Sequence, residues 1–155
     1  MKGKKMPLLH IENLTKSYKG KKALDAVTLD FTVGVNALLG ANGSGKSTMM
    51  NIISTALSPT GGAVYYDGRE ICSLGTEYRK VMSVLFQHQP YFPSVTVNDY
   101  MLYNAALKGM SGKDRQAVID NSLKRLNVLD CKAKKLKELS GGLRQRVFIA
   151  QTIMN

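Results

Sequence analysis

A glycine-rich segment in the first third of the chain reads Gly40-Ala41-Asn42-Gly43-Ser44-Gly45-Lys46-Ser47, followed by Thr48. It fits the pattern G-x-x-x-x-G-K-[ST], in which backbone N–H groups surround phosphate oxygens. Glycines are needed because a side chain would block the close approach of the backbone to the phosphates. The pattern predicts that Lys46 reaches the β- and γ-phosphates and that the Ser47 hydroxyl ligates Mg²⁺.

The residues on either side of this loop predict the strand and the helix that the motif requires. Residues 35–39 form a short apolar run typical of a buried parallel strand. Apolar residues recur at helical spacing over residues 49–57 until Pro59 ends the pattern. A helix beginning near Gly45 directs its positive end at the same phosphates. The alternative is a glycine-rich turn that matches by chance, which average residue usage makes roughly a one-in-a-hundred event. We therefore predict a nucleoside triphosphate site.

Length, charge and cysteine content set the limits of the interpretation. The 155 residues amount to one domain, and a hydrophobic content of 44% suffices for a core. No apolar run is long enough to predict a membrane span, and no signal-peptide core follows the basic N-terminus. Cys72 and Cys131 lack the spacing of a metal site or a disulfide framework, so we expect reduced thiols. The net charge of +11 raises the question of nucleic acid or anionic lipid, but its densest run, residues 132–137, fits a solvated face.

The remaining pattern is strand-rich before Gln87 and helix-rich after it. Strands are expected over residues 8–14, 23–31, 62–68 with an Asp-Gly turn, and 81–86, with a short helix over 77–80. Gln87 follows the last of these strands, where ligands bind in open α/β sheets. A surface glutamine is the equally weighted alternative.

The segment after Gln87 predicts helices and one further glycine-rich turn. Thr96 begins a capping-box-like sequence, the helix that follows ends at Gly109, and residues 111–114 begin another helix. We expect the aromatic residues of this segment to pack inside it. Leu139-Ser140-Gly141-Gly142-Leu143 then opens a final helix, whose N-terminus suits a phosphate. A plain serine N-cap is the alternative.

The order of these features resembles the ATP-binding subunits of ABC transporters from about Leu8 to Asn155. The resemblance implies an α/β P-loop NTPase core with an antiparallel β edge and an inserted helical subdomain. Residues 1–95 would be the ATP-binding core with its phosphate loop (Walker A), 96–138 the helical insertion, and 139–155 the signature motif with the start of its helix.

The resemblance also implies roles for individual residues. Tyr18 would stack on adenine, Gly40 to Thr48 would hold the phosphates of ATP, and Lys46 would act in catalysis. Ser47 would ligate Mg²⁺. Gln87 would contact the metal or the water and so act in catalysis. Ser140, Gly141 and Gly142 would reach the γ-phosphate of ATP bound to a partner subunit.

These roles imply an ATP hydrolase that works as a head-to-tail dimer, homo- or heteromeric, beside a membrane-spanning transporter subunit. The location would be cytoplasmic, peripheral at the inner face of the membrane, and no nucleic-acid partner is expected. Residues 31–35 and 90–107 look like those of exporters whose membrane subunit is encoded separately.

The chain departs from the family pattern in two places. Leu143 stands where many members have glutamine. The sequence stops inside the signature helix, before the family's Mg²⁺-binding aspartate, its catalytic glutamate (the general base) and a later histidine. Asp30, Asp67 and Asp130 lie where ordinary structural roles are expected. We therefore expect that the C-terminal part of the core is missing and that this chain is the N-terminal part of a longer subunit, with an exposed sheet edge. We also expect that the chain binds ATP more readily than it hydrolyses it.

Two other classes of function stay open on the residues alone. A soluble ABC-type ATPase acting on ribosomes or nucleic acid would explain the charge but would need a second copy of the motifs. A regulatory module that binds ATP without hydrolysing it would share the phosphate loop. Small-molecule kinases and GTPases do not explain residues 139–142, and the helical segment is too short for the heptad insertion of DNA-repair relatives.

Overall fold

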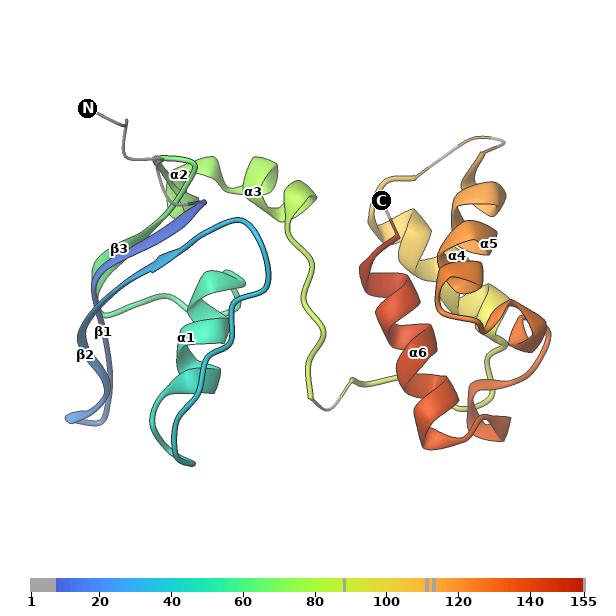
Figure 1. Ribbon diagram of the computed structural model, residues 1–155, viewed down its shortest axis with the longest axis horizontal. Helices are drawn as coiled ribbons and strands as arrows, with labels where there is room; N and C mark the ends of the chain where they lie inside the picture. The colour runs from blue at the N-terminus through green and yellow to red at the C-terminus, as the bar shows by residue number, and fades with distance from the viewer. Residues whose placement is uncertain (1–7, 88, 111, 113, 155) are drawn as a thin grey trace. The chain divides into compact units, whose positions relative to one another are not determined.

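The computed structural model describes residues 8–154 except residues 88, 111 and 113, and it divides into two compact units. Unit 1 comprises Met1–Met82 and unit 2 comprises Ser83–Asn155. Each unit has its own hydrophobic core, and Figure 1 shows strands in the first and helices alone in the second. No helix in the described part of the chain is long and apolar enough to span a bilayer.

Unit 1 is built on an antiparallel sheet whose strand order is β2-β1-β3-β4. The predicted antiparallel edge is thereby confirmed. Tight turns at Lys19-Gly20 and Asp67-Gly68, both with positive φ at each residue, join the neighbouring strands. The strands are β1 (Leu9–Tyr18), β2 (Lys21–Phe31), β3 (Gly61–Tyr66) and β4 (Arg69–Glu70).

A bulge in β1 decides which of its residues reach the core. Ile11 and Leu14 are both fully buried. They are three residues apart, so the regular alternation of a strand would place them on opposite faces of the sheet. The register shifts between these two residues, and Asn13 has a φ of 47°. An extra residue at this point turns both side chains to one face. There they pack with the buried residues of α1 (Lys46–Ile53), of α2 (Ile71–Leu74) and of α3 (Thr76–Val81).

Two predicted strands, residues 35–39 and 81–86, are wrong. Residues 32–40 and 82–86 are irregular, and Val81 instead ends α3. Val35 is fully exposed and Leu39 is 89% exposed. A parallel strand forms only where a neighbour supplies the ladder of hydrogen bonds, and β1 to β4 pair antiparallel with one another. Both apolar runs therefore remain outside the described sheet.

Unit 2 is helical, as the periodicity after Thr96 predicts. Its helices are α4 (Val97–Leu107), α5 (Arg115–Arg125) and α6 (Gly141–Thr152), with short 3₁₀ turns at Leu129–Cys131 and Leu136–Glu138. The predicted cap is confirmed, because the Thr96 hydroxyl accepts a hydrogen bond from Asp99 N at 3.1 Å. Ser111 and Lys113, in the predicted start of the next helix, lie outside the described residues, and Asp114 is the N-cap of α5.

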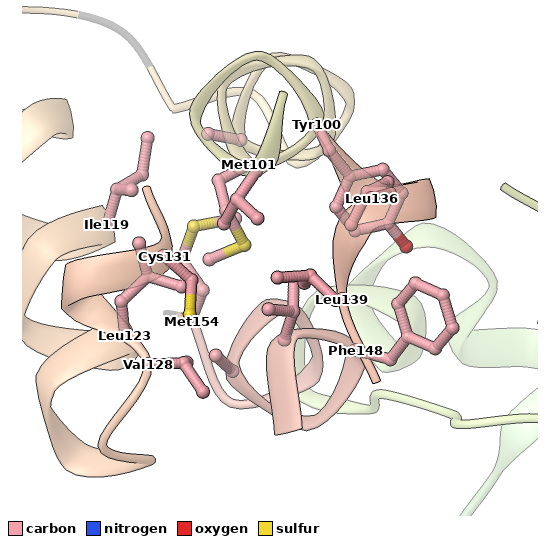
Figure 2. Close-up of a cluster of buried hydrophobic side chains, with 14 residues drawn as sticks. Tyr100, Met101, Ile119, Leu123, Val128, Cys131, Leu136, Leu139, Phe148 and Met154 are labelled. Atoms are coloured by element: carbon pink, nitrogen blue, oxygen red, sulfur yellow. The ribbon is translucent and has the colours of Figure 1, made fainter. Parts of the chain in front are cut away.

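The core of unit 2 joins all three helices (Figure 2). Met101, Leu123 and Val147 are fully buried, one from each helix. Tyr100 is buried as predicted, and its burial raises the pKa of its hydroxyl. Tyr103 is 54% exposed, so the expectation that the aromatics pack inside is wrong for this residue. Its side chain is therefore not part of the core that contains Tyr100.

Candidate nucleotide-binding site

Two glycines of the phosphate loop have backbone conformations that residues with a Cβ rarely adopt. Gly43 and Gly45 have φ angles of 83° and 91°, and Gly45 is the N-cap of α1. A Cβ on Gly45 would lie 2.5 Å from the Ala23 carbonyl oxygen. A Cβ on Gly40 would lie 2.8 Å from Ser44 Oγ. The loop thus needs Gly43 and Gly45 for its own shape, whereas the side chain of Ser44 can move away from a Cβ at Gly40.

The side chain of Lys46 folds back into this loop. Its Nζ donates to the carbonyl oxygens of Gly40 at 2.7 Å and Ala41 at 2.6 Å and to Ser44 Oγ at 3.3 Å. These three bonds use all the donors of the ammonium group. The positive charge is therefore held inside the loop, and a bound phosphate would have to replace one of these loop oxygens as the acceptor.

The start of α1 provides further groups that favour an anion. Met49 N makes the first bond of the helix, to Gly45 O, so the amides before it have no helical partner. The first turn contains no acidic residue, and the Ser47 hydroxyl is exposed there. Free N–H groups and the helix dipole together suit a phosphate. The role of Ser47 as a Mg²⁺ ligand stays a prediction, and no cluster of three His, Cys, Asp or Glu side chains that could hold a metal forms among the described residues.

Tyr18 lies at the end of β1 and is 47% exposed. Its hairpin partner is Lys21, and the nearby Ala23 on β2 is the residue that Gly45 contacts. Figure 1 accordingly shows the β1–β2 turn and the phosphate loop at the same end of unit 1. Lys16 Nζ lies 5.4 Å from the centroid of the Tyr18 ring. The structure thus brings Tyr18 and the loop into one region, and Lys16, which the sequence motif did not indicate, joins them.

The second glycine-rich turn, at residues 140–142, begins the last helix of unit 2. Ser140 is the N-cap of α6, and its Oγ accepts a hydrogen bond from Leu143 N at 3.3 Å. Ser140, Gly141 and Gly142 are exposed, and the first turn of α6 contains no acidic residue. The serine cap is therefore confirmed, whereas a phosphate contact at this turn stays a prediction.

The glycines of this second turn have no structural need to be glycine. A Cβ on Gly142 would meet no atom within 4 Å, and neither Gly141 nor Gly142 has a positive φ. We expect Gly142→Ala to raise the free energy of unfolding by about 0.4–1 kcal/mol, since alanine restricts the unfolded chain. Urea unfolding followed by circular dichroism measures the change. Gly109→Ala is the control and should destabilise the protein, because Gly109 has a φ of 75°. A destabilised Gly142→Ala protein would contradict this account.

Gln87 and the carboxylates complete the set of predicted residues. Gln87 is exposed in a bend of unit 2, whereas the phosphate loop belongs to unit 1, and the two units are described separately. Asp30 accepts a hydrogen bond from His10 at 2.6 Å, Asp67 forms a turn, and Asp130 lies in a 3₁₀ turn. These contacts agree with the structural roles expected for the three aspartates.

One functional candidate was missed by the sequence. The guanidinium carbon of Arg144 lies 4.9 Å from the centroid of the Tyr91 ring. Arg144 directly follows Leu143, and Tyr91 lies four residues after Gln87. No local pattern connects residues so far apart in the chain.

The fold resembles those of known nucleotide-binding proteins. A family model described as ABC transporter matches residues 24–155. CbiO1 from Clostridium perfringens, part of the ABC transporter complex cbiONQ, matches with 28% identity and a TM-score of 0.84 over 97% of this chain and 62% of its own. MJ1267, an ATP-binding cassette of an ABC transporter, matches with 27% identity and a TM-score of 0.84 over 97% of this chain and 66% of its own.

A longer structure matches as well, a bacterial Atm1-family ABC exporter with ATP bound. Its identity is 26% and its TM-score 0.78, over 96% of this chain and 28% of the exporter. This chain therefore spans less than two thirds of the length of each of these structures. The likeness confirms the predicted class, an α/β P-loop NTPase core with an antiparallel β edge and a helical insertion.

Proposed function

Because the chain belongs to the ABC transporter family, we propose that it is the ATP-binding part of a transporter, with its nucleotide held by the phosphate loop of unit 1. The observation that carries this proposal is the position of Lys46, whose ammonium is held inside a loop shaped by Gly43 and Gly45. Arrangements of this kind bind the β- and γ-phosphates of nucleotides. Tyr18, exposed at the same end of the unit, offers a ring on which adenine can stack.

The chemistry proposed for the site is Mg²⁺-dependent ATP hydrolysis. Mg²⁺ neutralises charge that develops on the phosphates during transfer. Lys46 would hold the phosphates, Ser47 would ligate the metal, and Gln87 would contact the metal or the water. We expect this chain to bind ATP strongly and to hydrolyse it slowly, since phosphoryl transfer to water depends on carboxylates that fix the metal and the water. Asp30, Asp67 and Asp130, the aspartates considered for this role, lie in a hydrogen bond to His10, a turn and a 3₁₀ turn instead.

The partner that fits the second turn is another nucleotide-binding subunit. Ser140, Gly141 and Gly142 would contact the γ-phosphate of ATP bound to that subunit, and the two subunits would pair head to tail. A pair of identical or different subunits would serve equally. The dimer would act on a membrane-spanning subunit at the cytoplasmic face; cbiO1, to which this chain is similar, is part of the ABC transporter complex cbiONQ. An export direction is the one we favour, from the likeness of residues 31–35 and 90–107 to exporters.

The net charge of +11 favours one alternative, an ABC-type ATPase acting on ribosomes or nucleic acid. Lysines and arginines that contact a nucleic-acid backbone make affinity fall steeply with salt. The alternative would be favoured over a transporter if the protein binds mixed RNA at the ionic strength of the cell and if the affinity falls steeply as salt is added.

The test of the proposed function is an ATP titration with Mg²⁺, followed by thermal unfolding. A ligand that binds only the folded state raises the melting temperature as its concentration rises. We expect a shift with MgATP and a smaller one with inorganic triphosphate, which lacks the base. A folded chain whose melting temperature does not respond to MgATP would contradict the proposal.

A variant of Tyr18 tests the adenine contact separately. Tyr18→Leu should weaken MgATP binding by about 1–3 kcal/mol, the usual contribution of base stacking on an aromatic ring. Tyr18→Phe should bind as the parent does, because the ring is retained. Binding of inorganic triphosphate should be equal in all three proteins. If Tyr18→Leu weakens both ligands alike, the ring acts on the loop rather than on the base.

A further inference from the structure

Arg144 joins two segments that are far apart in the sequence. Its guanidinium carbon lies 4.9 Å from the centroid of the Tyr91 ring, within the range of a cation–π contact. Its Nη1 donates to the carbonyl oxygen of Leu139 at 3.5 Å, and its backbone N donates to Ser140 O at 2.9 Å. One side chain thus connects the loop after Gln87 to the residue that precedes Ser140.

Tyr91 is held in turn by the core of unit 2. Its ring centroid lies 5.7 Å from that of Phe148, and the Phe148 centroid lies 5.7 Å from that of Tyr100. Phe148 and Tyr100 are each only 5% exposed, and Figure 2 shows them among the buried side chains beside Leu136 and Leu139. Tyr91 therefore presents its ring to Arg144 from a fixed support.

The turn formed by Ser140, Gly141 and Gly142 begins α6, where the Ser140 cap and the first helical bond, from Arg144 N to Ser140 O, hold the backbone. All three residues are exposed, and the space around the two glycines is open to 4 Å. Glycine gives the backbone a wide choice of conformations. The Ser140 Oγ bond to Leu143 N, at 3.3 Å, is longer than most hydrogen bonds of this type. Leu139 and Arg144 flank the turn, and the contact of Arg144 Nη1 with Leu139 O adds a side-chain support to these backbone bonds.

We propose that Tyr91 and Arg144 form a clamp that sets the geometry of the Ser140–Gly142 turn. Both are positioning residues, and neither is assigned a contact with a phosphate. A movement of Tyr91 would release the guanidinium from its support and loosen the Leu139 carbonyl, so the loop after Gln87 and the turn would change together. The importance of the clamp for ATP contact rests on the proposed function, whereas the clamp itself does not.

Amide hydrogen exchange on the whole chain without nucleotide tests the clamp. In Tyr91→Leu, the amides of Leu143 and Arg144 should exchange about tenfold faster than in the parent. Tyr91→Phe keeps the ring and should restore the parent rates. The control Tyr103→Leu removes an exposed tyrosine from α4 and should change neither amide. Equal rates in Tyr91→Leu and Tyr91→Phe would overturn the proposal.

A fluorescence measurement gives an answer even if Tyr91→Leu loosens the whole unit. The protein has no tryptophan, so Tyr91→Trp introduces a single indole opposite Arg144. Adding Arg144→Gln should change its emission, because the cation leaves the ring face. Adding Arg146→Gln, which removes an exposed charge from the same helix, should not. If the emission of Tyr91→Trp is the same with and without Arg144→Gln, the clamp is contradicted.

The two measurements use no nucleotide, so they separate the clamp from the proposed function. If the exchange rates and the emission change as expected and MgATP does not raise the melting temperature, the clamp is supported and the proposed ATP site is contradicted. If MgATP raises the melting temperature of the parent and neither measurement changes in the Tyr91 and Arg144 variants, the ATP site is supported and the clamp is contradicted.

Discussion

Replacing Lys46 by alanine should abolish most of the rise in melting temperature that MgATP gives. The ammonium is held inside the loop by Gly40 O, Ala41 O and Ser44 Oγ. Charge-assisted hydrogen bonds from it to phosphates contribute about 1.5–3 kcal/mol each, so losing them should weaken ATP binding roughly 100-fold. A ligand at 100 times its Kd stabilises the fold by about 2.7 kcal/mol. After a 100-fold loss of affinity, the same concentration gives only about 0.4 kcal/mol.

The nucleotide-free Lys46→Ala protein should unfold close to the parent temperature. The carbonyls of Gly40 and Ala41 belong to exposed residues, so water replaces the lost donor at little cost. Lys22→Ala is the matched control, since it removes the same charge from an exposed pair with Asp25 in the same unit. It should keep the full MgATP shift. An undiminished shift in Lys46→Ala would show that ATP binds elsewhere.

What the sequence predicted well is local chemistry. The cap at Thr96 and the turn at Asp67-Gly68 follow from groups within a few residues of one another, and the structure has both. The phosphate loop belongs to the same class, because its glycines are required by left-handed φ angles that the motif already implies. The pattern could not indicate that Gly45 also touches β2 at Ala23, since that contact comes from the packing of distant segments.

What it predicted wrongly depends on partners far away in the chain or outside it. An apolar run such as residues 35–39 indicates that burial is favourable, but it does not specify the strand that would provide it. Leu39 therefore remains 89% exposed in the described fold. Ile11 and Leu14 fail simple alternation for a different reason, a bulge whose position depends on pairing with β2 and β3. The Tyr91–Arg144 contact, too, appears only once unit 2 has folded.

Gly45→Ala should destabilise unit 1 by about 2–5 kcal/mol, through two causes that add. A residue with a Cβ at a φ of 91° is strained by about 1–2 kcal/mol. The Cβ would also lie 2.5 Å from the Ala23 carbonyl oxygen and 2.7 Å from Leu24 Cδ2. Backbone cannot yield as a side chain can, and crowding of this kind costs about 1–3 kcal/mol. Urea unfolding followed by circular dichroism measures the loss.

Gly43→Ala separates these two causes, because Gly43 has a φ of 83° and open space where its Cβ would lie. It should cost only the conformational strain, about 1–2 kcal/mol. The excess loss in Gly45→Ala then measures how firmly the start of α1 is seated on β2 at Ala23. Equal losses in the two variants would mean that β2 moves aside at little cost. In that case the hairpin that contains Tyr18 would not be rigidly tied to the phosphate loop, and the two would not form one preorganised site.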